Sequence, residues 1–196
     1  MSSFALVNAV PHLFWITSRA AGIVALVLSS LSVSLGLAMS LRLVRRLGTD
    51  RLAVHEALSL ATIIAIAVHG LTLIGDPWMH PSLAAVSIPF VDTYKTGWTS
   101  LGIVAGWAMT LLGLGYYARR VIGAARWRSM HRLTAVAWIA GLVHSFGEGT
   151  DAGQMWFAAM VAAVALPALA LLAGRLLTTR EPAPARRRPV PLPESG

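Results

Sequence analysis

Two pairs of histidines lie in segments that are otherwise almost entirely apolar. His55 and His69 bound the stretch "HEALSLATIIAIAVH", and His131 and His144 bound "HRLTAVAWIAGLVH". Neutral imidazole is a common metal ligand, and a polar side chain inside a membrane is costly and usually functional. Two facing histidines with no cysteine nearby suit the two axial positions of a haem iron. The alternative for each histidine is a hydrogen bond between two packed helices.

The composition places these histidines in a membrane. The chain has 196 residues, of which 56% are hydrophobic and only 12% are charged, which is too apolar for an ordinary soluble domain. No segment shows the alternation of a membrane β-strand, and apolar runs of about twenty residues can cross the bilayer as helices. The sequence therefore predicts an all-α membrane protein with five transmembrane helices, at about 13–40, 52–75, 98–118, 131–147 and 154–177.

The positive charge follows the predicted topology, so the formal charge of +8 is no sign of nucleic-acid binding. Arginines concentrate in three segments, and the two other connections hold a single basic residue, Lys95. By the positive-inside rule, the arginine-rich side is cytoplasmic and the N-terminus lies outside. We expect a multi-pass protein of the cell membrane, of the bacterial inner-membrane type. The arginines are Arg42, Arg45, Arg46 and Arg51, then Arg119, Arg120, Arg126, Arg128 and Arg132, and finally Arg175, Arg180, Arg186, Arg187 and Arg188.

Two regions follow from this pattern. Residues 1–180 are expected to form the helical bundle, with its first helix retained because the apolar run is too long for a signal peptide. Residues 181–196, rich in Pro and Arg, are expected to be a disordered cytoplasmic tail. The absence of cysteine excludes disulfides, iron–sulfur clusters, thiolate ligation of haem and covalent attachment of haem.

The predicted topology matches the four histidines by depth. The helices that carry them both run from the cytoplasm outward, so His55 and His131 lie near the inner face and His69 and His144 near the outer face. The spacings correspond to about 21 Å and about 20 Å along a helix. One histidine from each helix can therefore meet a partner at each of two depths, and haems held there would carry electrons across the membrane.

The spacing in the second pair is awkward for a straight helix. Fourteen residues return His69 to the face of His55, whereas thirteen residues leave His131 and His144 about 140° apart. The helix at 131–147 is therefore expected to tilt, tighten or bend, with Gly141 as a candidate position, or to fray at its start.

The blocks "HEALSLATIIAIAVHG" and "RWRSMHRLTAVAWIAGLVH" resemble the ferric reductase-like transmembrane domain family, which includes the membrane part of ferric reductases and NADPH oxidases and the haem subunit of a periplasmic methionine sulfoxide reductase system. The resemblance covers helices 1 to 5 and implies that the four histidines ligate two b-type haems, His55 with His131 and His69 with His144. "SRAAGIVALVL" resembles the helix that brings an arginine, here Arg19, toward the outer haem. Arg51, Arg128 and Arg132 are weaker candidates for binding the inner haem's propionates.

The function that the resemblance implies is transmembrane electron transfer, as an oxidoreductase component. Only about twenty residues follow the fifth helix, and no Gly-rich dinucleotide motif follows a strand. We therefore expect no flavin or nicotinamide domain on this chain. The electrons are expected to come from a separate cytoplasmic flavin reductase or from a quinol, and to reach an acceptor at the outer face.

Two other functions stay open from the residues. The first is a haem-bearing anchor subunit of a larger redox complex, which would bind haem but show no turnover with a small acceptor. The second is a proton or metal transporter with a histidine relay, although its spans hold almost no carboxylates. His12 and His80 are expected at the outer surface. The small residues of "SSLSVSLG" and the tryptophans at 107, 138 and 156 are expected to pack in the core.

Overall fold

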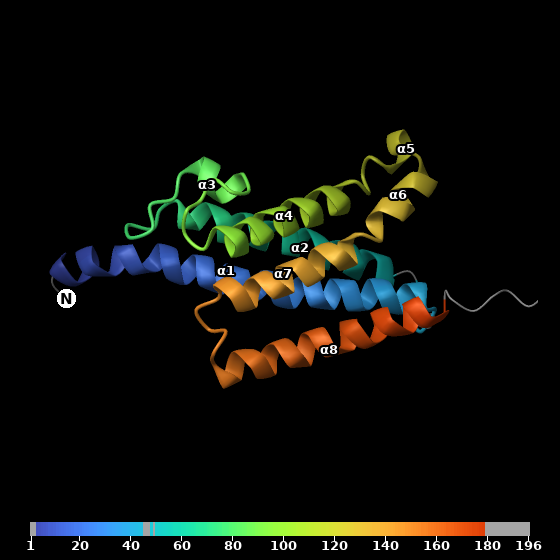
Figure 1. Cartoon of the computed structure of the whole chain (residues 1–196). Helices are drawn as coiled ribbons and strands as arrows, with labels where there is room; N and C mark the ends of the chain where they lie inside the picture. Colours follow the sequence, from blue (N-terminus) through green and yellow to red (C-terminus); the bar gives the residue numbers. More distant parts are fainter. Residues whose placement is uncertain (1–2, 45–47, 49, 179–196) are drawn as a thin grey trace, which may run out of the picture.

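The structure is a bundle of α-helices. The computed structural model describes residues 3–44, 48 and 50–178, with side chains from residue 12 onward, and no strand occurs among them. The predicted tail at 181–196 lies outside the described residues. The helices, labelled in Figure 1, are α1 (Ser3–Ser40), α2 (Asp50–Leu73), α3 (Leu83–Ser87), α4 (Thr96–Leu114), α5 (Arg119–Ile122), α6 (Ala124–His131), α7 (Thr134–Glu148) and α8 (Met155–Thr178).

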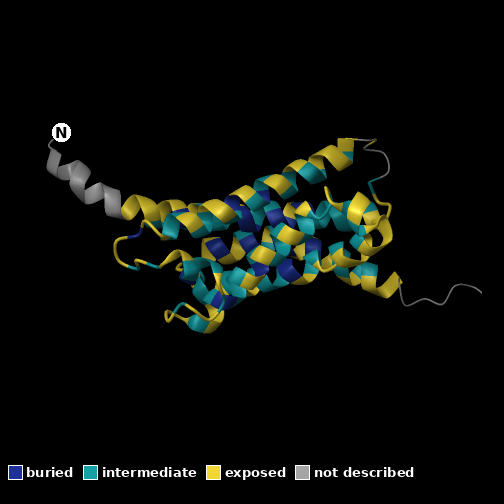
Figure 2. Cartoon of the chain, turned by 90° about the horizontal axis from the view of Figure 1, so that it is seen from above, coloured by how far each residue is buried: buried dark blue, intermediate teal, exposed yellow. Residues whose placement is uncertain are grey.

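Four helices of the described chain are long and apolar enough to cross a membrane: α1 from His12 onward, α2, α4 and α8. Large apolar side chains stay exposed on their outer faces, such as Ile64 on α2, Leu111 on α4 and Leu166 on α8. Figure 2 shows this exposed surface around a small buried interior. Lipid is the solvent in which such a surface is stable, and the prediction of an all-α membrane protein is confirmed at this level.

The helix predicted at 131–147, the fourth of the five, does not begin at His131. α6 ends at His131 and α7 begins at Thr134, so Arg132 and Leu133 form a turn between them. The amide of Leu133 donates to the carbonyl of Met130 (2.9 Å), and the Thr134 hydroxyl donates to the carbonyl of His131 (2.7 Å). Gly141 lies inside the unbroken α7, so the helix is not interrupted at this candidate position. The alternative, that the helix departs from regular geometry at its start near His131, agrees with the break. α7 alone rises only about 22 Å.

The connections gather at two ends of the bundle (Figure 1). The loop that contains α3 and the connection between α7 and α8 lie at the end nearer the N-terminus. The α5–α6 segment lies at the opposite end, together with the end of α1, the start of α2 and the end of α8. α1 packs against α2, α7 and α8, and α4 packs against α7 and α2. α1 is therefore the central helix, in contact with both helices that carry the outer histidines.

The core lies between α1, α7 and α8. Trp138 of α7 is only 1% exposed, and its indole Nε1 donates to the buried hydroxyl of Ser30 on α1 (3.0 Å). Leu26 and four residues of α8 complete this cluster: Phe157, Val161, Ala165 and Ala168. The core prediction is confirmed for Trp138, but it is wrong for the tryptophans at 107 and 156, which are 51% and 48% exposed. Apolar character does not separate core from surface in a chain whose surroundings are also apolar.

Candidate functional site

The outer pair of histidines meets between α2 and α7. The ring centroids of His69 and His144 lie 6.4 Å apart, with the planes at 70° to each other. Ser18 of α1 lies beside His69, because its hydroxyl donates to the carbonyl oxygen of His69 (2.8 Å). Three helices therefore build this site: α1, α2 and α7.

The inner pair meets between α2 and the end of α6. The ring centroids of His55 and His131 lie 6.3 Å apart, with the planes at 90°. His131 reaches this position because it is the last residue of α6 and not part of α7. Because of the break at Arg132 and Leu133, His131 and His144 do not lie on one straight helix, and the expected offset of 140° does not apply. The structure brings together the two histidine pairs that the topology predicts.

The two separations fit a metal held between the rings. A metal–imidazole bond is about 2 Å long and the nitrogen lies about 1.2 Å from the ring centroid, so two axial imidazoles on one metal have centroids about 6.3 Å apart. A direct N–H···N hydrogen bond of about 3 Å would bring the centroids to about 5.4 Å. The observed values of 6.3 Å and 6.4 Å match the first arrangement and exceed the second. Edge-on contacts between two rings have similar values, such as 6.5 Å between Trp78 and Tyr94, so the separation agrees with a shared metal but is not specific for one.

The hydrogen bonds fix the tautomer of three of the four histidines. The Nδ1 atom of His69 lies 2.8 Å from the carbonyl oxygen of Ser18, and that of His144 lies 2.8 Å from the carbonyl oxygen of Trp98. The Nδ1 atom of His131 lies 3.3 Å from the carbonyl oxygen of Leu112. A carbonyl only accepts, so each Nδ1 carries the proton and Nε2 keeps its lone pair. Histidines that ligate metals are held in this way.

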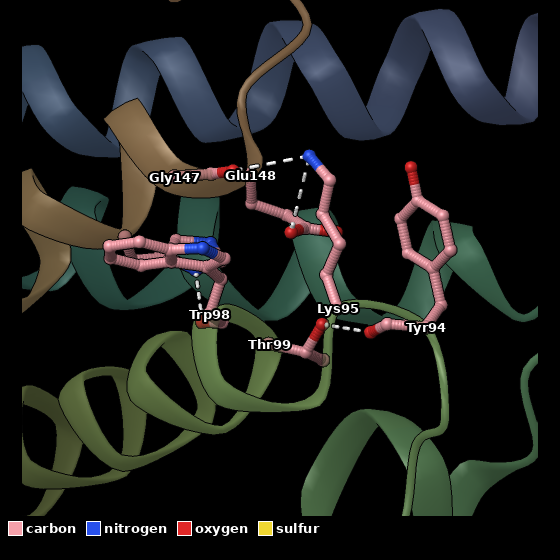
Figure 3. Close-up of polar contacts among 7 residues, drawn as sticks. Tyr94, Lys95, Trp98, Thr99, Gly147 and Glu148 are labelled. Carbon is pink, nitrogen blue, oxygen red and sulfur yellow. Dashed lines mark hydrogen bonds and ion pairs between the residues drawn. The ribbon is translucent and has the colours of Figure 1, made fainter.

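Polar contacts hold the start of α4, where the backbone carbonyl of Trp98 accepts a hydrogen bond from His144 (Figure 3). Lys95, immediately before α4, donates from Nζ to the carbonyl oxygen of Gly147 on α7 (3.1 Å) and lies 3.8 Å from a carboxylate oxygen of Glu148. The Trp98 ring packs so tightly against Gly147 that a side chain there would collide with it. The start of α4 is therefore fixed to the end of α7, next to the carbonyl of Trp98 that accepts from His144.

Glycines make room for three of the imidazoles. A Cβ atom added to Gly102 of α4 would lie 2.5 Å from the His144 ring, and one added to Gly22 of α1 would lie 3.0 Å from His69. A Cβ added to Gly36 would lie 3.2 Å from His55. The first distance is a collision and the other two are tight, so the helices approach each histidine at a glycine.

Sequence reasoning considered Arg19 of α1 but missed the serines and glycines of this helix that contact the histidines, although a signal exists. The segments "SRAAG" at 18–22 and "SVSLG" at 32–36 repeat the pattern Ser-x-x-x-Gly at a spacing of 14 residues, which is also the spacing of the histidines on α2. Ser18 and Gly22 contact His69, whereas Ser32 and Gly36 contact His55. The segment "SSLSVSLG" was predicted only to pack in the core. Two of its residues, Ser32 and Gly36, face the candidate ligand His55.

Arg19 lies on α1 next to Ser18, but its guanidinium is bound by a carboxylate of this chain. Nε donates to one carboxylate oxygen of Asp151 (2.5 Å), and Nη2 donates to the other. The guanidinium carbon also lies 5.2 Å from the centroid of the Trp15 ring. Asp151, in the connection between α7 and α8, is 7% exposed. The sequence did not predict this partner, which holds the α7–α8 connection on α1.

The inner site has a polar atom without a partner. Trp127 of α6 stacks on His131, with ring centroids 5.0 Å apart and the planes at 27°. The Trp127 Nε1 atom is buried and has no hydrogen-bond acceptor within the described residues. Arg128 and Arg132 are exposed on either side of His131, and the Arg51 Nη1 atom lies 3.5 Å from the carbonyl oxygen of Val44.

Glu56 follows His55 in the sequence but points to another partner. Its carboxylate accepts a hydrogen bond from the hydroxyl of Tyr117, just after α4 (2.5 Å). This hydrogen bond is the main cause that raises the pKa of Tyr117 above the ordinary tyrosine value of about 10.

The stabilisation from this hydrogen bond should be complete below the ordinary pKa of tyrosine and be lost as the pH rises through the raised pKa of Tyr117. The phenolate absorbance of Tyr117, obtained as the difference between the wild type and Tyr117→Phe during a pH titration, checks this. The Glu56→Gln variant should bring the pKa of Tyr117 back toward its ordinary value. An unchanged titration in that variant would exclude Glu56 as the cause.

The other histidines do not join a site. His12 and His80 are exposed and neither lies in a histidine pair. Among the described residues there is no group of three or more His, Cys, Asp or Glu that could hold a bare metal ion. Each histidine pair therefore offers two imidazoles and is not part of a larger group of these residue types among the described residues.

Comparison of the chain with protein-family models finds no matching family. Comparisons with curated proteins and with solved structures also find no match. The resemblance to the ferric reductase-like transmembrane domain therefore stays a prediction, carried by the histidine blocks and their spacing.

Proposed function

We propose that the protein is a transmembrane b-type cytochrome with two haems, one ligated by His55 and His131 and the other by His69 and His144. It would carry electrons from a cytoplasmic flavin reductase or a quinol to an acceptor at the outer face of the cell membrane. The observation that carries the proposal is the separation of the two histidine pairs, 6.3 Å and 6.4 Å. Each separation suits one hexacoordinate iron.

The chain's own residues prepare these sites. The carbonyls of Ser18, Trp98 and Leu112 orient three imidazoles and keep their Nε2 lone pairs free. The haem iron, when bound, supplies the change between the ferric and ferrous states. The unpartnered indole nitrogen of Trp127 suits a haem propionate at the inner site, with Arg128 and Arg132 nearby in the sequence. Because two histidines would hold each haem iron, we expect an acceptor to take electrons at the haem edge.

The proposal includes five spans with the N-terminus outside. α7 is shorter than an average span, but it packs against α1 and α4 and carries His144 at the same level as His69. The described parts of the arginine-rich segments, which include α5, α6, the start of α2 and the end of α8, lie at the end of the bundle opposite the one that holds α3. This distribution supports a cytoplasmic location for α5 and α6.

The test is the visible spectrum of the purified chain. A dithionite-reduced minus oxidised spectrum, with haem counted per chain, should show two b-type haems. The oxidised protein should give strongly anisotropic low-spin ferric EPR signals, because the imidazole planes in each pair are far from parallel. No absorbance in cells supplied with haem would refute the proposal and favour a histidine-relay transporter. Two haems without turnover with any small acceptor would indicate an anchor subunit.

Gly102 on α4 allows a test of the outer site, with a second glycine of the same helix as the control. Gly102→Ala should displace His144, because the added Cβ would lie 2.5 Å from its ring, and overpacking costs about 1–3 kcal/mol. We expect lower occupancy of the outer haem and a lower melting temperature. Gly97→Ala on the same helix is the control, since a Cβ there has nothing within 4 Å. Equal haem contents in the two variants would show that α4 does not limit the outer site.

A further inference from the structure

The Nδ1 atoms of His69, His131 and His144 face backbone carbonyls, and that of His69 also lies 3.1 Å from the hydroxyl oxygen of Ser18. The Nδ1 atom of His55 lies 3.3 Å from the hydroxyl oxygen of Ser32, a residue of α1 that is 6% exposed. The backbone of Ser32 also hydrogen-bonds His55. A hydroxyl both donates and accepts, so the contact with the Ser32 hydroxyl alone leaves the tautomer of His55 open.

A second serine, Ser59, bears on which ring nitrogen of His55 carries the proton. The hydroxyl of Ser59, one turn after His55 on α2, donates to the carbonyl oxygen of His55 (2.8 Å). Its oxygen also lies 2.9 Å from the oxygen of Ser32. Each hydroxyl has one proton. When Ser59 donates its proton to this carbonyl, Ser32 is the donor in the hydrogen bond to Ser59.

The same counting of hydroxyl protons applies to the hydrogen bond between Ser32 and the imidazole of His55. Ser32 has given its only proton to Ser59, so its oxygen can only accept from His55. The Nδ1 atom of His55 therefore carries the proton, and its Nε2 atom carries the lone pair. We propose that Ser59 and Ser32 form a hydrogen-bonded pair that fixes this tautomer and so prepares His55 to ligate the inner haem.

Both serines are positioning residues, since they act through His55, and the inference rests on the proposed haem-binding function. Ser32→Ala removes the acceptor for the Nδ1 proton. Ser59→Ala leaves the imidazole contact in place but frees the proton of Ser32, which can then be donated to Nδ1. The proton of His55 then moves to Nε2, the atom that must bind the metal. Losing such a second partner typically lowers metal affinity about 10–100-fold.

The test uses the full chain with His69→Ala, which isolates the inner site, and titrates the haem-free protein with haem. Ser32→Ala and Ser59→Ala should each weaken haem binding about 10–100-fold. Ser32→Thr should restore it, because threonine keeps the hydroxyl. Ser29→Ala is the control, since Ser29 is equally buried on α1 and donates to the carbonyl of Leu26 in its own helix (3.0 Å).

A second measurement separates the failure of this inference from the failure of the proposed function. In haem-free chain labelled with ¹⁵N-histidine, the NMR shifts of His55 should report a proton on Nδ1 in the wild type and on Nε2 in Ser59→Ala. Normal haem affinity in both alanine variants, or an unchanged ¹⁵N pattern in Ser59→Ala, would overturn the role of the serines while leaving the cytochrome intact. Absence of haem binding by the wild-type chain would instead refute the cytochrome.

Discussion

Replacing His69 by alanine is expected to leave one haem per chain and to stop electron transfer across the membrane. The outer iron would lose one of its two protein ligands, and the inner site lies about 21 Å away along α2. Electron tunnelling falls steeply over such a distance, so the outer face would be cut off from the inner donor. The measurements are haem content and the reduction of an external acceptor by proteoliposomes that contain a reductant.

Two further variants make this result specific. His131→Ala should also leave one haem, but with the outer site retained, so its remaining EPR signal should differ from that of His69→Ala. His80→Ala should keep both haems and full transfer, because His80 is exposed and unpaired with another histidine. Two haems in His69→Ala, or a loss of haem in His80→Ala, would contradict the assignment of ligands.

Replacing Trp138 by alanine is expected to give the largest loss of stability of any single substitution in the described core. Trp138 is 1% exposed, and truncation of a buried tryptophan costs about 3–5 kcal/mol. Its loss would also leave the buried hydroxyl of Ser30 without the indole donor. Because α7 carries His144, the outer haem should be released at a lower temperature than in the wild type.

Thermal unfolding in detergent, followed by far-ultraviolet circular dichroism and by haem absorbance, measures both effects. Trp156→Ala is the matched control, because Trp156 is 48% exposed and its ring lies on the surface of α8. The control should lower the melting temperature only slightly. Equal losses in the two variants would mean that Trp138 does not form the core between α1, α7 and α8.

The sequence predicted the helices and the histidine pairs well, because both depend on local patterns. Apolar runs have the length of a span, and depth along a helix follows from residue number. The 13-residue spacing predicted that the helix at 131–147 is not straight, with a bend at Gly141 or a frayed start as alternatives. The sequence could not choose between them, since the turn at Arg132 and Leu133 has no glycine or proline to mark it. The chain solves the mismatch at the start of the helix.

The groups around the histidines were harder to predict than the histidines themselves. The carbonyls of Ser18, Trp98 and Leu112 belong to the backbone, and residue type does not reveal which carbonyl faces a ring. The pairing of Arg19 with Asp151 joins residues 132 positions apart, and only the packed bundle brings them together. Burial of tryptophans was unreliable for a different reason, because lipid and core are equally apolar.

The repeat on α1 has a consequence for how this chain can change in length. Ser18 and Gly22 serve one histidine and Ser32 and Gly36 the other, and α1 runs antiparallel to α2, so a single alignment of the two helices satisfies both. A residue inserted between Gly22 and Ser32 would shift one Ser-x-x-x-Gly segment relative to the other. Only one of the two segments could then still contact its histidine. The register between α1 and α2 is thus fixed at two points, and we expect insertions or deletions to be tolerated only outside residues 18–36.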